Sequence, residues 1–289
     1  MKRLFDPRGM LITAMTIFGT IGLFVRRIGV SSGELALYRA VLAAVVIGLF
    51  LLVTKQKIPF RKLGRELILL LISGAAMGFN WILLFEAYKY TTVSVATLSY
   101  YFAPVLVTLA CPLLFREKMS GKNWLCFVMS TVGIVLITGV GDLSGGGAHM
   151  KGILFGLGAA CFYAGVILLN KFIKNVQGIH RTFLQFLAAI GVMIPYVVLS
   201  GGTTLHTLDA PGWICLLIVG LVHTGAAYCL YFSSLKELPG QKSAILSYID
   251  PLVAVILSVA VLGEAMTVPQ IIGGVLILGF TLWNEIGTK

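Results

Sequence analysis

Long apolar stretches alternate along the chain with short clusters of charged and turn-forming residues. Each stretch is about 20 residues long, which is the length an α-helix needs to cross the hydrocarbon core of a bilayer. Breaking the chain at the polar clusters gives ten segments: 10–29, 34–54, 66–88, 93–115, 122–141, 152–170, 182–201, 211–235, 243–262 and 267–286. The pattern predicts an all-α integral membrane protein with ten transmembrane helices.

Composition leads to the same class. Of the 289 residues, 58% are hydrophobic and 11% are charged, and the mean hydropathy is +0.97. A soluble domain carries about 25% charged residues, so a single water-soluble globule is excluded. The five cysteines form no CxxC pair and show no metal-ligand spacing, so we expect neither a metal nor a cofactor.

The net charge of +11 is better explained by membrane orientation than by nucleic acid. No basic stripe interleaved with aromatic residues occurs outside the apolar segments, so we expect no nucleic-acid partner. With the N-terminus in the cytoplasm, 17 Lys and Arg residues fall on the inner side and 4 on the outer side. Positive charge concentrates on the cytoplasmic side of membrane proteins. We therefore expect both termini in the cytoplasm and a multi-pass protein of a bacterial inner (cytoplasmic) membrane.

The two halves of the chain share features at a nearly constant spacing. At an offset of 147 residues the halves match at Tyr101 and Tyr248, at Pro104 and Pro251, and at Glu117 and Glu264; at 145 residues Phe18 matches Tyr163. Five crossings in each half force the second copy into the opposite orientation. We predict a first five-helix repeat over 1–141, an external linker over 142–151, and an inverted second repeat over 152–289.

Two stretches resemble a known family. The segments Asn80–Lys118 and Tyr231–Glu264 are similar to the third-fourth and eighth-ninth helices of the EamA family in the drug/metabolite transporter superfamily. The signals are a proline followed 13 residues later by Glu in each half, Asp250 before the second proline, and Arg39. The resemblance implies a ten-helix inverted-repeat secondary transporter that works by alternating access and often exports amino acids or other small metabolites. It also implies a cavity built from helices 1, 3 and 4 of one half and 6, 8 and 9 of the other.

Asp250 is the most informative polar position, because an ionisable residue inside a span is costly and is usually functional. It lies next to Pro251 in the ninth segment. We expect it to bind a substrate amine or to carry a coupling proton; the alternative is a structural carboxylate that caps broken backbone or binds a hydroxyl. Pro104 and Pro251 are predicted as the compliant hinge points of the transport cycle.

Arg39 and Glu86 are predicted to share one membrane depth, in the second and third segments. An ion pair between them would neutralise both charges. The alternative is that Arg39 offers its guanidinium fork to a substrate carboxylate.

Aromatic residues are dense around the prolines, and a subset is expected to line the cavity. Tyr101 and Tyr248 are the best pair, each three residues before a proline. Aromatic faces beside a carboxylate suit an amine through cation-π attraction, and they suit an aromatic amino acid equally. The other candidate substrate-binding residues are Phe18, Asn80, Trp81, Tyr163 and Tyr228.

Motifs for other functions are absent from the sequence. It contains no P-loop or HExxH motif, so we expect no enzyme. The sequence predicts a secondary active transporter that exports an amino acid or amine-bearing metabolite, with protons as coupling ion, as a monomer or homodimer in the lipid bilayer. The alternatives are an importer of an organic cation such as a quaternary amine, and a membrane receptor that does not transport.

Overall fold

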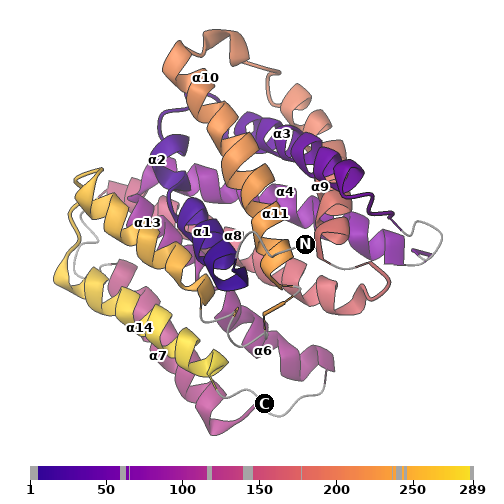
Figure 1. Ribbon diagram of the computed structural model, residues 1–289. Helices are drawn as coiled ribbons and strands as arrows, with labels where there is room; N and C mark the ends of the chain where they lie inside the picture. Colours follow the sequence, from indigo (N-terminus) through magenta and orange to yellow (C-terminus); the bar gives the residue numbers. More distant parts are fainter. Residues whose placement is uncertain are drawn as a thin grey trace.

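A computed structural model describes residues 6–58, 63–64, 66–115, 119–138, 146–176, 178–235, 237–238, 243 and 246–286. Every regular element in these ranges is helical (Figure 1). The elements are α1 (Pro7–Gly19), α2 (Ile21–Val25), α3 (Ser32–Val53), α4 (Glu66–Tyr90), α5 (Val93–Tyr100), α6 (Ala103–Phe115), α7 (Gly121–Thr138), α8 (Gly146–Phe172), α9 (Gly178–Leu199), the 3-10 helix η2 (Leu205–Thr207), α10 (Ala210–Leu217), the π-helix η3 (Ile218–Ala226), α11 (Ala227–Leu235), α13 (Ile249–Ala260) and α14 (Val268–Glu285).

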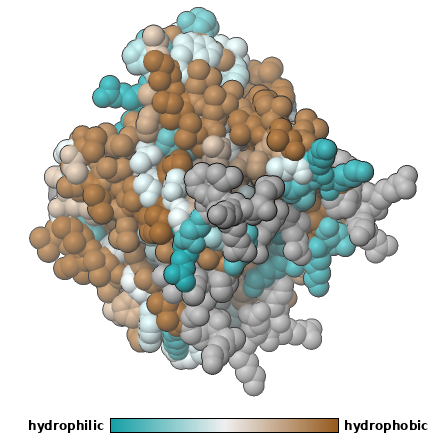
Figure 2. Space-filling view, in the orientation of Figure 1, coloured by the Kyte–Doolittle hydropathy of each residue, from teal (hydrophilic) through white to brown (hydrophobic). Residues whose placement is uncertain are grey.

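The helices are long and apolar enough for a membrane protein. Within the described residues seven helical stretches have the length and hydropathy to cross a bilayer, and three shorter apolar helices, Gly121–Ile137, Ile249–Ala260 and Val268–Asn284, accompany them. Hydrophobic residues spread over much of the face seen in Figure 2, and Leu52, Val53 and Leu199 are among the most exposed. The prediction of an all-helical membrane protein is confirmed. The ten crossings, the inverted repeat and the cytoplasmic termini stay predictions.

Part of the predicted external linker is helical. Residues 142–145 lie outside the described residues, but α8 already begins at Gly146. Its first turns are held by α4 and the turn that follows it, because the Thr91 hydroxyl lies 2.8 Å from His149 Nδ1 and Lys151 donates to the Tyr90 hydroxyl at 3.1 Å. These contacts override the low helix propensity of a glycine-rich stretch.

Several predicted spans are interrupted helices. The first breaks at Thr20 between α1 and α2, and the fourth breaks at Tyr101 and Phe102 between α5 and α6. The eighth continues from α10 through the π-helix η3 into α11. Two of these interruptions meet, because the Thr20 hydroxyl lies 2.7 Å from His223 Nε2 in η3.

The two prolines that match between the halves lie at the start of a helix and not in its middle. Pro104 is the second residue of α6 and Pro251 is the third residue of α13. The first N–H groups of a helix have no intrahelical partner, so a proline there removes no hydrogen bond. Where the sequence predicted a bend within a helix, the structure therefore has a break followed by a new helix. The break lies at Tyr101 and Phe102 in the first half and at Tyr248 in the second.

Helix packing brings the two halves of the chain together. α4 packs along α8, α3 along α9 and η3, and α1 along α11 and α13. α14 lies beside α7 (Figure 1), where Gly133 and Gly273 face each other. A Cβ on Gly133 would stand 2.7 Å from the Gly273 carbonyl oxygen, so only glycine permits this contact.

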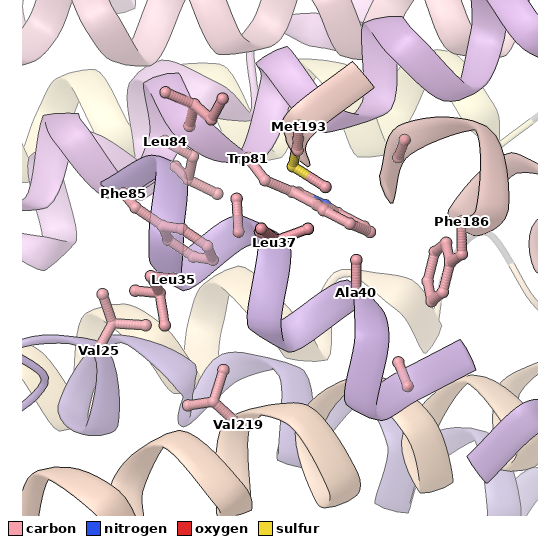
Figure 3. Close-up of a cluster of buried hydrophobic side chains, with 14 of the residues drawn as sticks. Val25, Leu35, Leu37, Ala40, Trp81, Leu84, Phe85, Phe186, Met193 and Val219 are labelled. Atoms are coloured by element: carbon pink, nitrogen blue, oxygen red, sulfur yellow. The ribbon is translucent and has the colours of Figure 1, made fainter. Parts of the chain in front are cut away.

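The largest buried cluster is formed by α3, α4 and α9 with η3. Trp81 lies at its centre, surrounded by Ala40 of α3 and by Phe186 and Met193 of α9 (Figure 3). All four side chains are at most 5% exposed. This core fixes the rotation of α3 and α4, and with it the direction of the polar side chains that they carry.

Candidate functional site

The predicted residues Asp250 and Tyr101 meet at the junction of three helices. Asp250 is in the first turn of α13, and Tyr101 occupies the break after α5. The Tyr101 hydroxyl donates to Asp250 Oδ2 at 2.6 Å. α1 also approaches closely, since a Cβ on Gly19 would lie 2.6 Å from the Asp250 carbonyl oxygen. The carboxylate is half-buried, and no Lys or Arg of the described ranges lies within ion-pair distance of it.

Aromatic rings surround this carboxylate. The Tyr100 ring stacks on Tyr163 with centroids 5.2 Å apart and meets Tyr101 edge-on at 5.8 Å. Phe18 of α1 contacts Tyr228 of α11 edge-on at 5.2 Å. Tyr163 and Tyr228 both lie within electrostatic range of Asp250. The structure therefore brings the predicted Phe18, Tyr101, Tyr163 and Tyr228 together.

The aromatic residues around Asp250 are partly exposed. Tyr163 remains 39% exposed despite its stacked neighbour, and Tyr100, Tyr101 and Tyr228 are half-buried. Tyr100 was not among the predicted site residues, although it stands beside Tyr101. Tyr100 lies in the last turn of α5, on the side that contacts α8. This position results from the helix break that follows it, and the hydropathy pattern does not reveal that break.

Three other predicted site residues belong to helix packing. Asn80 is buried, and its amide nitrogen donates to the Ala159 carbonyl oxygen at 2.6 Å, which joins α4 to α8. Trp81 is 5% exposed in the core cluster, and Tyr248 is 9% exposed at the residue before α13. All three side chains are at least nine-tenths buried in this conformation.

The predicted ion pair between Arg39 and Glu86 is wrong. Glu86 accepts from the Ser32 hydroxyl at 2.6 Å and pairs with Lys89 at 3.3 Å. Arg39 instead lies over the Trp81 ring and donates from Nε to Thr224 Oγ1 at 2.6 Å. Phe85 and Glu86 are neighbours in α4, so their side chains point about 100° apart around the helix. Phe85 faces Arg39, and Glu86 therefore points elsewhere.

A polar junction connects the halves at the ends of α2, α5 and α13. Arg26 forms an ion pair with Glu264, with Nη1 and Oε1 2.6 Å apart. Glu264 also accepts from the Val93 backbone N–H at 2.9 Å and from the Ser258 hydroxyl, and Ser94 donates to Ser258 at 2.7 Å. We call these five residues the polar junction. The sequence analysis counted Arg26 only among the four outer-side charges and used Glu264 only as a repeat marker. The local sequence around a charge does not reveal a partner that is distant along the chain.

Comparisons with known proteins place the chain in a family. The model of the EamA-like transporter family matches residues 9–139 and 150–284. The "Uncharacterized transporter YxxF" of Bacillus subtilis is 31% identical over 268 residues, which cover 92% of this chain and 85% of that protein. An "Uncharacterized transporter" of Archaeoglobus fulgidus is 27% identical and covers 95% of each chain.

A solved crystal structure supports the same architecture. It is 18% identical, covers 94% of each chain and superposes with a TM-score of 0.64, so it shares the fold. The apolar helices and the family match together show a multi-pass membrane transporter with a small-molecule substrate. The chain belongs to the EamA-like transporter family of the drug/metabolite transporter superfamily.

Proposed function

We propose that this transporter is a secondary carrier that exports an amino acid or another small amine-bearing metabolite across the bacterial inner membrane. The observation that carries the proposal is the half-buried Asp250 carboxylate, hydrogen-bonded to Tyr101 and surrounded by aromatic rings. A carboxylate attracts an ammonium group, and aromatic faces add cation-π attraction. An ionisable residue that holds no charged partner inside a span is also suited to exchange a proton with the cargo.

The cycle that we propose is alternating access between two inverted repeats. Support comes from two matches of the family model to separate halves of the chain, 9–139 and 150–284. Asp250 and Tyr101 come from different halves of the chain. Movement of one half against the other would therefore change the geometry of the proposed binding site directly. The helix breaks at Tyr101 and Tyr248 are the proposed compliant points, next to Pro104 and Pro251.

The polar junction is proposed to close the outer side in this conformation. Arg26 follows the first span, which runs outward from the predicted cytoplasmic N-terminus. The pairing of Arg26 with Glu264 then joins the outer ends of α2 and α13. Opening toward the outside would require this ion pair and the hydrogen bond between Ser94 and Ser258 to separate.

The test is flux in liposomes that contain a pH-sensitive dye. Purified protein is challenged with amino acids, polyamines and quaternary ammonium compounds. Asp250→Asn should abolish substrate-dependent proton movement, because the amide keeps the shape and loses the charge. Asp209→Asn is the matched control, since Asp209 caps α10 through Gly212 and Asn caps a helix equally well.

Each outcome decides between the candidates. Proton-coupled flux of amino acids or primary amines that depends on Asp250 supports the proposal. Flux of quaternary ammonium compounds alone would favour an importer of organic cations. Binding without flux of cargo or protons across the panel would favour a receptor, and equal flux by Asp250→Asn and the parent protein would remove Asp250 from the mechanism.

A further inference from the structure

Arg39 is a buried cation with its guanidinium face covered by aromatic rings. It lies in α3 and is 5% exposed. The central guanidinium carbon is 4.6 Å from the centroid of the Trp81 ring and 5.3 Å from that of Phe85. These rings stabilise the positive charge through the cation-π attraction.

One edge of the guanidinium is fixed. Nε donates to Thr224 Oγ1 at 2.6 Å, and the Thr224 hydroxyl donates to the Val219 carbonyl oxygen at 2.8 Å. Both residues belong to η3, where π-helical winding places Thr224 one turn after Val219. π-Helical turns occur frequently at functional sites because they redirect single side chains. Here the winding holds the acceptor of Arg39.

The charge of Arg39 has no carboxylate partner in the described part of the chain. Three acidic residues of the described helices are engaged elsewhere: Glu86 with Ser32 and Lys89, Glu34 with Thr204 and Ser31, and Asp250 with Tyr101. Among the described residues Nη1 and Nη2 make no hydrogen bond, whereas Nε does. Neither Nη atom is among the fully enclosed polar atoms without a partner, so each keeps a small accessible surface.

The cation is also connected to the Asp250 site. Tyr228 lies within electrostatic range of both Arg39 and Asp250, and Tyr100 does so as well. The buried cation and the half-buried carboxylate therefore share aromatic neighbours.

We infer that Arg39 is the binding site for an oxyanion of the transported molecule, namely a carboxylate held by Nη1 and Nη2. A planar guanidinium offers paired donors that match the two oxygens of a carboxylate. Burying an arginine without an anion is costly, and a cargo carboxylate removes that cost when it binds. This inference rests on the proposed transport function and specifies its substrate class as a carboxylate-bearing molecule.

Binding of three related probes tests the inference. They share one phenyl ring: phenylalanine carries an amine and a carboxylate, 3-phenylpropionate the carboxylate alone, and phenethylamine the amine alone. Binding is measured by isothermal titration calorimetry with protein in lipid nanodiscs. Arg39→Gln should weaken binding of the two carboxylates by about 10- to 100-fold, the range for a lost charge-assisted hydrogen bond. Binding of phenethylamine should stay within about twofold, the scatter allowed for groups with no shared partner.

Further variants separate binding from folding. Arg39→Lys keeps the charge and should retain part of the affinity for carboxylates, while Thr224→Val removes the acceptor of Nε and should weaken it by about 2- to 10-fold. Arg27→Gln is the matched control, because Arg27 is exposed. Size-exclusion profiles and thermal unfolding of each variant show whether the fold is retained.

Two results would overturn the inference. One is equal affinity of the parent protein and a folded Arg39→Gln variant for 3-phenylpropionate and phenylalanine, which would leave Arg39 a purely structural cation. The other is failure of the parent protein to bind either carboxylate. In both cases flux of amines through Asp250 could persist, so the proposed transport function would stand or fall by its own assay.

Discussion

Removal of one oxygen atom tests the contribution of the hydrogen bond from Tyr101 to Asp250. Tyr101→Phe keeps the ring contact with Tyr100 and removes the hydroxyl that donates to the carboxylate. Leaving a partly buried hydrogen-bond acceptor without its donor lowers the free energy of unfolding by about 1–3 kcal/mol. We expect the free energy of unfolding, measured in SDS and detergent mixed micelles, to fall by that amount.

The control for this prediction is Tyr196→Phe. Tyr196 contacts Phe79 through its ring, and its hydroxyl makes no hydrogen bond to the residues that the structure describes, so the free energy should change by less than about 0.5 kcal/mol. If Asp250→Asn and Tyr101→Phe have additive effects, the two groups are not coupled and the prediction fails.

Single residues also show where sequence reasoning stops. Hydropathy gives the depth of a residue in a span, and it correctly put Arg39 and Glu86 in neighbouring helices. It does not give rotation about the helix axis, which depends on core contacts such as those of Trp81 with Phe186. The sequence predicted only that Asp250 and Tyr101 line the same cavity. Their direct hydrogen bond depends on tertiary packing of α1, α5 and α13.

At the scale of elements, close packing of α7 with α14 depends on two glycines. Gly133→Ala would place a Cβ 2.7 Å from the Gly273 carbonyl oxygen, so the helices must separate. Overpacking of this kind costs about 1–3 kcal/mol. We expect unfolding of Gly133→Ala to require correspondingly less free energy in the same mixed-micelle measurement.

A glycine of α14 that faces open space supplies the comparison. A Cβ at Gly279 would meet nothing within 4 Å. Because alanine favours a helix over glycine by up to about 1 kcal/mol, Gly279→Ala should leave stability unchanged or raise it. Equal effects of the two substitutions would show that the contact between α7 and α14 does not limit stability.

Element positions followed from the sequence, and their interruptions did not. The apolar runs located most helical segments to within a few residues, because burial in lipid or protein demands long apolar runs, although α8 begins at Gly146 and not at residue 152. The breaks at Thr20 and at Tyr101 were missed, as was the π-helix η3, since a helix that changes winding remains equally apolar. Those irregular turns are held by distant partners, such as His223 for Thr20 and Arg39 for Thr224.

For the whole molecule, the polar junction offers a way to lock the two halves. The Ser94 and Ser258 hydroxyl oxygens are 2.7 Å apart, one from each half. A disulfide needs sulfur atoms about 2.05 Å apart with Cβ atoms about 3.8 Å apart, a geometry that this close pair can reach. The double variant Ser94→Cys with Ser258→Cys should therefore cross-link under mild oxidation.

Cross-linking tests whether transport needs the halves to separate at this junction. Under the proposed cycle, oxidation of the double variant should abolish flux in liposomes, and dithiothreitol should restore it. Each single cysteine variant should transport equally well in both conditions, which accounts for oxidation of the native cysteines, Cys161 being exposed. Because the cross-link leaves Asp250, Tyr101 and Arg39 in place, loss of flux with retained probe binding would assign the effect to movement. Undiminished flux through a fully cross-linked protein would instead place the moving contact elsewhere and refute the polar junction as the closed side of the carrier.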